Sequence, residues 1–162
     1  MQANQFGFGY IAVAVCAGAA LVAAMTVPVR AAEDVAAVVA KRQAAMKAMS
    51  ANVKIISQYT EGSADQSAAV AAVKIVQDTA KTVPSLFPPA TGMEQLPGKS
   101  GAKPEIWTDP QKFKDAAAAL VTGSDELAKS VAAGDPAATR ASLLALGKTG
   151  CGTCHDAYRV KI

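Results

Sequence analysis

Scarce residue types limit what this chain can do before any motif is considered. It has one histidine and three cysteines, and because Cys16 lies in an apolar N-terminal segment, the rest of the chain cannot supply the four ligands of a structural zinc site. Aromatic residues make up only 5% of the chain, which argues against a β-sandwich. The net charge of +3 is small, and neither a basic patch interleaved with aromatic residues nor a glycine-rich phosphate loop is present. The sequence therefore predicts no nucleic-acid partner.

The single histidine stands beside two of the cysteines, in the stretch Cys151-Gly152-Thr153-Cys154-His155. Two cysteines three apart, followed directly by histidine, form the attachment signature of a c-type haem. Residues i and i+3 of a helix share a face, so both sulfur atoms can reach one porphyrin, and a histidine at i+4 can bind its iron. A thioredoxin-like dithiol would need a βαβ context that is not visible here, and a disulfide would leave the histidine unexplained. We predict one haem c, joined covalently to Cys151 and Cys154, with His155 as an iron ligand.

Residues 1–31 are typical of a secretory signal peptide. An almost continuous apolar run without charge extends from Phe6 to Val29, and Val29 and Ala31 suit the last positions before a cleavage site. The run is long and no lysine or arginine precedes it, so an uncleaved membrane anchor stays open as an alternative. In both cases we predict that residues 32–162 form one exported, periplasmic domain, and that the mature domain does not contact the membrane.

Hydrophobic residues recur at three- and four-residue steps in four segments, which predicts helices over residues 33–58, 63–82, 109–131 and from 135 into the haem motif. A capping box of Ser63 and Gln66 predicts the second start, and the pairs beginning at Asp109 and Asp135, each followed by proline, predict the third and fourth. The sequence therefore predicts an all-α, antiparallel four-helix bundle with the haem motif in its last helix.

The same periodicity predicts which side chains face the core. In the second helix they are Val70, Val73, Val76 and Ala80; in the last helix they are Leu143, Gly147, Cys151, Cys154 and Tyr158. Glycines 147, 150 and 152 each cost about 1 kcal/mol relative to alanine inside a helix, so a macrocycle lying against the backbone or a local kink is expected there. Residues 83–108 are rich in proline and glycine and predict a long ordered loop, pinned to the bundle by Phe87 and Trp107.

Several short stretches together resemble the class II cytochromes c, the cytochrome c prime family. They are Arg42-Gln43-Ala44-Ala45-Met46, Leu86-Phe87-Pro88, Pro104-Glu105-Ile106-Trp107 and the run from Cys151 to Arg159. The resemblance covers the chain after the leader. It implies that Arg42 and Gln43 border the haem, with the Arg42 guanidinium pairing to a propionate, and that His155 is the proximal ligand. Homodimers formed through the first two helices are also implied.

The resemblance also makes the sixth iron ligand the residue that decides the function. In low-spin members a methionine of the first helix binds the iron, and Met46 stands at that position, with Met49 as its main rival and Met93 in the loop as a third candidate. We therefore expect an electron carrier with a histidine–methionine haem that serves redox partner proteins. The alternative is a five-coordinate haem that binds nitric oxide or carbon monoxide. An enzyme is disfavoured, because no distal histidine and no acid–base pair can be found.

Overall fold

The computed structural model describes residues 35–162, all of which belong to one compact unit, Ala31–Ile162. The predicted leader lies outside the described residues and stays a prediction. Within residues 35–162 the only β feature is an isolated bridge between Ala102 and Arg159, so the all-α prediction is confirmed. No helix in this part of the chain combines the length and the apolar character needed to cross a membrane.

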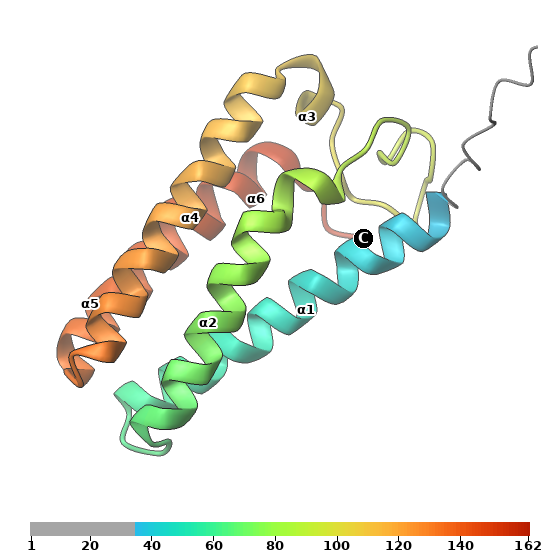
Figure 1. The fold of residues 1–162 in the computed structure, drawn as a ribbon. Coiled ribbons are helices and arrows are strands. Elements are labelled where there is room, and N and C mark those ends of the chain that lie inside the picture. The colour runs from blue at the N-terminus through green and yellow to red at the C-terminus, as the bar shows by residue number, and fades with distance from the viewer. Residues whose placement is uncertain (1–34) are drawn as a thin grey trace, which may run out of the picture. The chain divides into compact units, whose positions relative to one another are not determined.

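Four long helical rods pack side by side (Figure 1). In chain order the elements are α1 (Val35–Thr60), α2 (Gln66–Thr82), η1 (Val83–Leu86), α3 (Glu105–Thr108), α4 (Pro110–Ala132), α5 (Pro136–Ala145), η2 (Leu146–Gly152) and α6 (Thr153–Tyr158). The last three follow one another without a break and are called the C-terminal rod below. The predicted four-helix bundle is confirmed, and the long loop contains only the short elements η1 and α3.

The two Asp-Pro signals start helices as predicted. The Asp109 carboxylate accepts from the backbone N–H of Lys112, and that of Asp135 accepts from the next helical N–H groups. The capping box is wrong: Asp65 caps α2 by accepting from the N–H of Ala68, whereas the Ser63 hydroxyl donates back to a carbonyl of α1. The tight turn after α1 places Asp65 directly before the helix, so the nearer carboxylate takes the capping role.

The core lies along α2 and α4, and the predicted inward residues Val73, Val76 and Ala80 of α2 are buried, whereas the prediction for Val70 is wrong. Val70, expected inside, is 45% exposed, and Ile75 is 43% exposed. The buried side chains of α2 are Ala69, Ala72, Val73, Val76 and Ala80. Two overlapping apolar stripes are available on α2, and the one with more alanine is buried because small residues let α1 and α4 approach closely.

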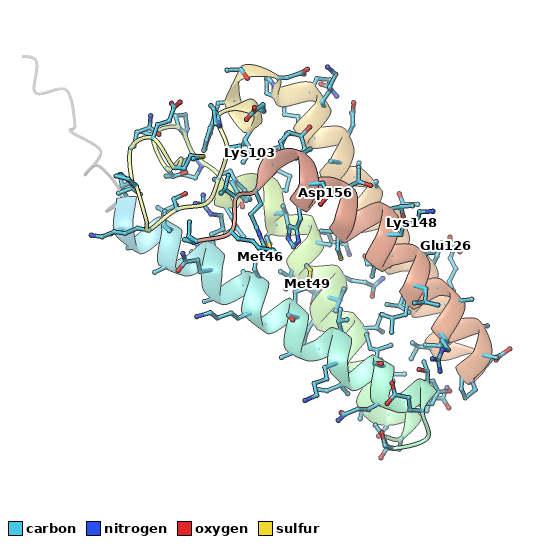
Figure 2. The ribbon with its side chains drawn as sticks, turned by 180° about the vertical axis from the view of Figure 1, so that it is seen from behind. Met46, Met49, Lys103, Glu126, Lys148 and Asp156 are labelled. Atoms are coloured by element: carbon cyan, nitrogen blue, oxygen red, sulfur yellow. The ribbon has the colours of Figure 1, made fainter. Side chains whose placement is uncertain are left out.

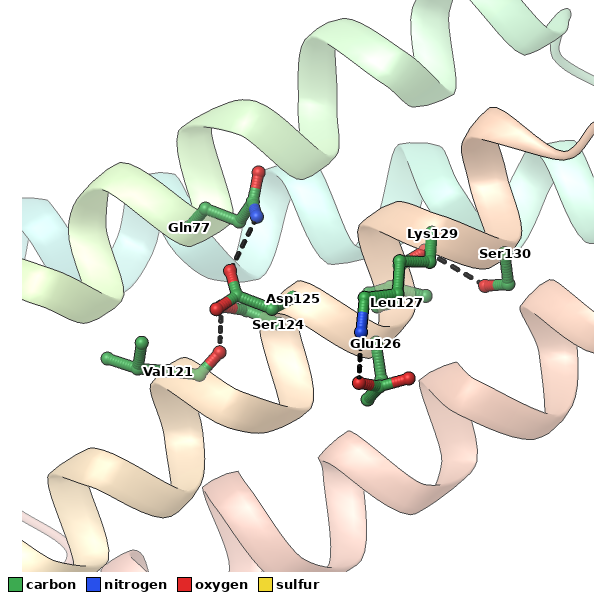
Figure 3. A network of polar contacts seen from close by, with 8 residues as sticks. All are labelled: Gln77, Val121, Ser124, Asp125, Glu126, Leu127, Lys129 and Ser130. Atoms are coloured by element: carbon green, nitrogen blue, oxygen red, sulfur yellow. Dashed lines mark hydrogen bonds and ion pairs between the residues drawn. The ribbon is translucent and has the colours of Figure 1, made fainter.

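The contact between α2 and α4 is called the closed seam below. It consists of buried apolar side chains and one polar link at its edge. Leu127 and Val131 of α4 are fully buried with Val76 of α2. At the edge, Gln77 Nε2 donates to Asp125 Oδ1 over 2.7 Å, which ties the two helices together (Figure 3). The buried hydroxyl of Ser124 donates to the carbonyl of Val121, so its polar group is satisfied within α4.

The C-terminal rod is not a uniform α-helix, because η2 is a π-helical segment that runs into the haem motif and includes Cys151. This wider turn changes which side chains face inward: Gly147, predicted to face the core, is exposed, and Leu146 is buried in its place. A Cβ atom on Gly150 would lie 2.9 Å from Leu146 Cδ1, and one on Gly123 of α4 would lie at the same distance. The two glycines therefore make room for Leu146, and π-turns of this kind are frequent at functional sites.

Candidate functional site

The four rods do not close completely. Helix α1 contacts α5 but neither η2 nor α6, and a cavity of about 710 Å³ lies where they separate. Its walls come from α1, from the start of α4, from η2 and α6, and from the last residues of the chain. The volume lies within the range of about 300–1,000 Å³ that is usual for small-molecule and cofactor sites.

The residues of the haem motif line this cavity. Cys151, Cys154 and His155 all contribute to its wall, so the structure brings the three predicted residues to one site. Both cysteines are free thiols and half-buried, and the disulfide alternative has no support in the described structure. Burial raises the pKa of both thiols, and the neighbouring Cys151 raises that of Cys154 further. The thiols are therefore kept protonated and unpaired, facing the cavity.

His155 is favoured in the form that can bind a metal. Partial burial lowers the pKa of its imidazole, and the positive charge of Arg159 lowers it further, against a smaller opposite effect of Asp156. A neutral imidazole keeps a ring nitrogen lone pair available for iron. Arg159 lines the cavity next to His155, one turn along, as its spacing in the sequence suggests.

Two methionines of α1 line the wall that faces the haem motif. Met46 is half-buried, whereas Met49 is only 6% exposed and belongs to the hydrophobic core. Figure 2 shows both on the side of α1 that faces the C-terminal rod. Met93, the third candidate, lies elsewhere: it lines a separate cavity of about 240 Å³ beside Trp107. The loop methionine is therefore not brought to the haem motif.

Arg42 lines the cavity, but its guanidinium group is directed into the loop. It is 5% exposed; one terminal nitrogen donates to Thr91 Oγ1 and the Leu86 carbonyl, and the other donates to the Thr91 carbonyl and Ser100 Oγ. The guanidinium carbon also lies 4.5 Å from the centre of the Phe87 ring. Burial lowers the pKa of Arg42. These contacts give Arg42 a loop-anchoring role that the sequence did not suggest, and its predicted pairing with a propionate stays a prediction.

Gln43 lies beside Arg42 at the edge of the cavity. Its amide donates to the backbone oxygen of Lys99 over 2.9 Å, so it too is tied to the long loop. Gln43 lines the cavity with an exposed side chain, and its predicted place at the border of a haem stays a prediction.

A row of aromatic rings forms another part of the wall. Phe113 of α4 packs edge-on against Phe87 at 5.1 Å and against Tyr158 at 5.3 Å between ring centroids. Trp107 Nε1 donates to the Phe87 carbonyl within the loop, and both rings pack against the hydrophobic core, so the two residues pin the loop to the bundle as predicted. The rings join the loop, α4 and α6 into one apolar surface.

The C-terminal tail completes the cavity, and the sequence analysis missed this. Residues 159–162 leave α6 in an extended conformation and pair with the loop: Lys103 N–H donates to the Tyr158 carbonyl, and Val160 N–H to the Gly101 carbonyl. A Cβ atom on Gly101 would collide with the Val160 backbone oxygen, so glycine is required for this close approach. Only the alternation of charged and apolar residues in the tail could have suggested an extended segment.

An apolar cavity in a four-helix bundle, with two thiols and a neutral imidazole from one helical turn on its wall, defines a c-type haem protein. A family model described as cytochrome C′ matches residues 37–159. The chain therefore belongs to the cytochrome c′ family, whose members are periplasmic haem proteins of electron transfer or gas binding. Its cofactor is covalently attached haem c.

Relatives and solved structures agree with this assignment. A cytochrome c-556 of Agrobacterium tumefaciens (strain II Chrys) is 34% identical over 125 residues, which are 76% of this chain and 97% of that protein. A ferrous variant of cytochrome c prime from Alcaligenes xylosoxidans with bound NO has a TM-score of 0.67 and 29% identity, covering 77% of this chain and 94% of that one. A cytochrome c′ with ligand-controlled dimer dissociation has a TM-score of 0.71 and 25% identity, covering 78% and 97%.

The residues present suit this cofactor. The cavity presents mostly apolar side chains to a macrocycle and, at its edge, cationic side chains of the kind that propionates require. Among residues 35–162, no group of three or more histidine, cysteine or acidic side chains could hold a bare metal ion. The cysteine–histidine motif is therefore suited to a porphyrin and not to a metal ion alone.

Proposed function

We propose that this protein is a periplasmic carrier of single electrons whose haem iron is bound by His155 and Met46. The observation that supports this best is that Met46 and His155 line one cavity from walls that do not touch, since α1 contacts neither η2 nor α6. Cys151 and Cys154 would hold the macrocycle by thioethers. A haem bound there supplies an iron that exchanges one electron between its ferrous and ferric states.

The side chains around the cavity determine how that iron behaves. The Met46 thioether and the His155 imidazole would both bind the iron, which would then have no vacancy for a small molecule. Methionine–histidine ligation raises the haem potential. Met49 and Val53 line the wall beside Met46 with apolar groups, which would help to exclude water from a bound iron.

We infer transport rather than catalysis. His155 is the single histidine of the chain and would be used by the iron, and no carboxylate lines the cavity. The cavity wall therefore offers no acid–base pair that could take part in catalysis at the iron. We also propose that the domain is exported, in line with the periplasmic location of the family, with residues 1–31 as its leader.

A five-coordinate gas-binding haem is the second candidate, favoured by the NO complex of the Alcaligenes relative. In that case Met46 would lie beside an open position without binding the iron. The two candidates predict different spectra and different reactivity towards carbon monoxide, which makes them separable in one preparation.

The test compares Met46→Ala with Met49→Ala in the haem-loaded protein. We expect the ferric protein to show the far-red absorption band of iron–thioether ligation, Met46→Ala to abolish it, and Met49→Ala to keep it. Ferrous Met46→Ala should bind carbon monoxide rapidly, unlike the wild type. Rapid carbon monoxide binding by the wild type would instead establish the gas-binding function, and loss of the band only in Met49→Ala would move the ligand to that residue.

We also propose a homodimer formed through α1 and α2. Val70 and Ile75 are large apolar side chains left exposed on α2, and α2 contacts neither α5 nor α6, so this face is free of the rest of the bundle. Sedimentation of the wild type and of Val70→Asp tests this: the wild type should sediment as a dimer and the variant as a monomer. A monomeric wild type contradicts the proposal.

A further inference from the structure

Positive charge gathers around the mouth of the cavity. Four of the residues that line it are cationic and none is acidic; the cations are Arg42, Lys47, Arg159 and Lys161. Arg42 is buried and donates into the loop, but the other three are exposed. Lys99 and Lys103 lie next to them, because the Lys99 carbonyl accepts from Gln43 and Lys103 pairs with the tail. We call Lys47, Lys99, Lys103, Arg159 and Lys161 the cationic rim.

No carboxylate neutralises this rim in the described part of the chain. The three ion pairs within residues 35–162 involve Lys74, Lys112 and Lys129, none of which belongs to the rim. Lys103 Nζ donates to the backbone oxygen of Asp156 over 3.0 Å and not to its carboxylate. Two haem propionates would offset two of the five cations of the rim.

The centre of the rim is apolar. In the tail, charged and apolar side chains alternate, and both Val160 and Ile162 are exposed while lining the cavity. The pairing of Val160 with Gly101 holds this segment extended across the opening. Apolar side chains beside cations at the edge of the cavity have the composition of a transient protein interface.

We propose that the cationic rim is the docking surface for an acidic electron-transfer protein. The inference rests on the electron-carrier function proposed above and adds the class of partner and the place of contact. A reduced partner docked there gives up one electron as the ferric iron becomes ferrous, and no bond forms or breaks. Complementary charge accelerates such encounters at low salt, by about 10- to 1,000-fold in other systems.

The experiment measures reduction of the ferric, haem-loaded protein by a reduced plant-type ferredoxin, used as a defined acidic donor, at low and high ionic strength. The rim variant is Lys47→Glu/Lys161→Glu, with Lys47→Gln/Lys161→Gln as a milder form. The matched control is Lys114→Glu/Arg140→Glu, which changes the net charge equally at two exposed side chains that neither line the cavity nor form an ion pair. Absorption spectra, melting temperatures and haem potentials of all variants exclude misfolding or a changed driving force.

We expect the wild-type rate to fall as salt rises, the rim variant to be about 10-fold slower at low salt, and the control to stay within about two-fold of the wild type. Equal slowing of rim and control variants, or a wild-type rate independent of salt, would overturn the proposal. So would a rim effect seen with the small anion hexacyanoferrate but not with ferredoxin, which would indicate a small-anion site. A haem that neither reagent reduces or oxidises would instead refute the electron-carrier function.

Discussion

Two sides of the bundle differ in how completely their side chains pack. They are the closed seam between α2 and α4 and the open side between α1 and the C-terminal rod, and both are built from the same kinds of residue. At the seam, Val76, Leu127 and Val131 have no exposed surface, and Gln77 and Asp125 join the helices. On the open side, Met46 and the two thiols of the haem motif face a cavity of about 710 Å³.

The closed seam is packed by protein side chains alone, whereas the packing of the open side is complete only when a cofactor fills its cavity. Protein interiors are close-packed, and an apolar cavity of this size loses contact energy along its whole lining. A covalently held haem would restore these contacts. We therefore expect the two sides to respond differently to haem removal and to mutation.

Haem removal should give the largest effect. Cys151→Ser/Cys154→Ser should lower the free energy of unfolding by about 5 kcal/mol, the order expected when a few hundred Å² of apolar surface loses its cover. Hydrogen exchange should accelerate in η2, α6 and the facing half of α1, while the closed seam stays protected. Denaturant unfolding and exchange mass spectrometry measure both; uniform acceleration across the bundle would contradict the division into two sides.

The free energy of unfolding lost when a side chain is shortened should depend on haem differently in the two regions. Leu127→Ala in the seam should cost about 2–5 kcal/mol with or without haem, because its surroundings are protein in both states. Met49→Ala, on the cavity wall, should cost markedly more with haem bound, when its neighbours are in place. Paired denaturation curves of haem-loaded and haem-free protein decide this, and equal haem dependence would remove the distinction.

Arg42 connects the open side to the loop, and its removal should be costly. Arg42→Ala leaves four hydrogen bonds to the loop unmade and should destabilise the protein by about 2–3 kcal/mol, with faster proteolysis within residues 87–104. Its neighbour is the control: Gln43→Ala loses one exposed hydrogen bond and should cost less than about 1 kcal/mol. Similar losses for both would mean that the guanidinium does not hold the loop.

The smallest effects concern two glycines of η2. At Gly150 a Cβ atom would lie 3.3 Å from Leu120 Cα of α4, so Gly150→Ala should cost about 1–2 kcal/mol through overpacking. At Gly147 a Cβ atom meets nothing within 4 Å, so Gly147→Ala should be neutral or stabilising by up to about 1 kcal/mol. Melting temperatures test the difference, and a stabilising Gly150→Ala would show that the rod can move away from α4.

Features that depend on neighbours in space could not be predicted in the same way as those that depend on neighbours in the chain. Val70 and Val73 fit the same apolar period, but the packing of α2 against α1 and α4 buries only Val73 and leaves Val70 exposed. The partners of Arg42 are 44 to 58 residues away in the chain. The π-turn moved Leu146 into the core, and the cationic rim assembles from α1, the loop and the tail.

The sequence by itself determined the haem motif, the Asp-Pro helix starts and the four-helix architecture, because each follows from chemistry within a few residues of the chain. His155 was the one histidine available, and its spacing from Cys151 placed it on the haem side without any knowledge of the fold. Only the tertiary structure decided that Met93 lies away from the cavity, that Arg42 anchors the loop, and that the tail pairs at Gly101 to form the mouth. These depend on how the helices are turned and how closely they approach, which local periodicity does not specify.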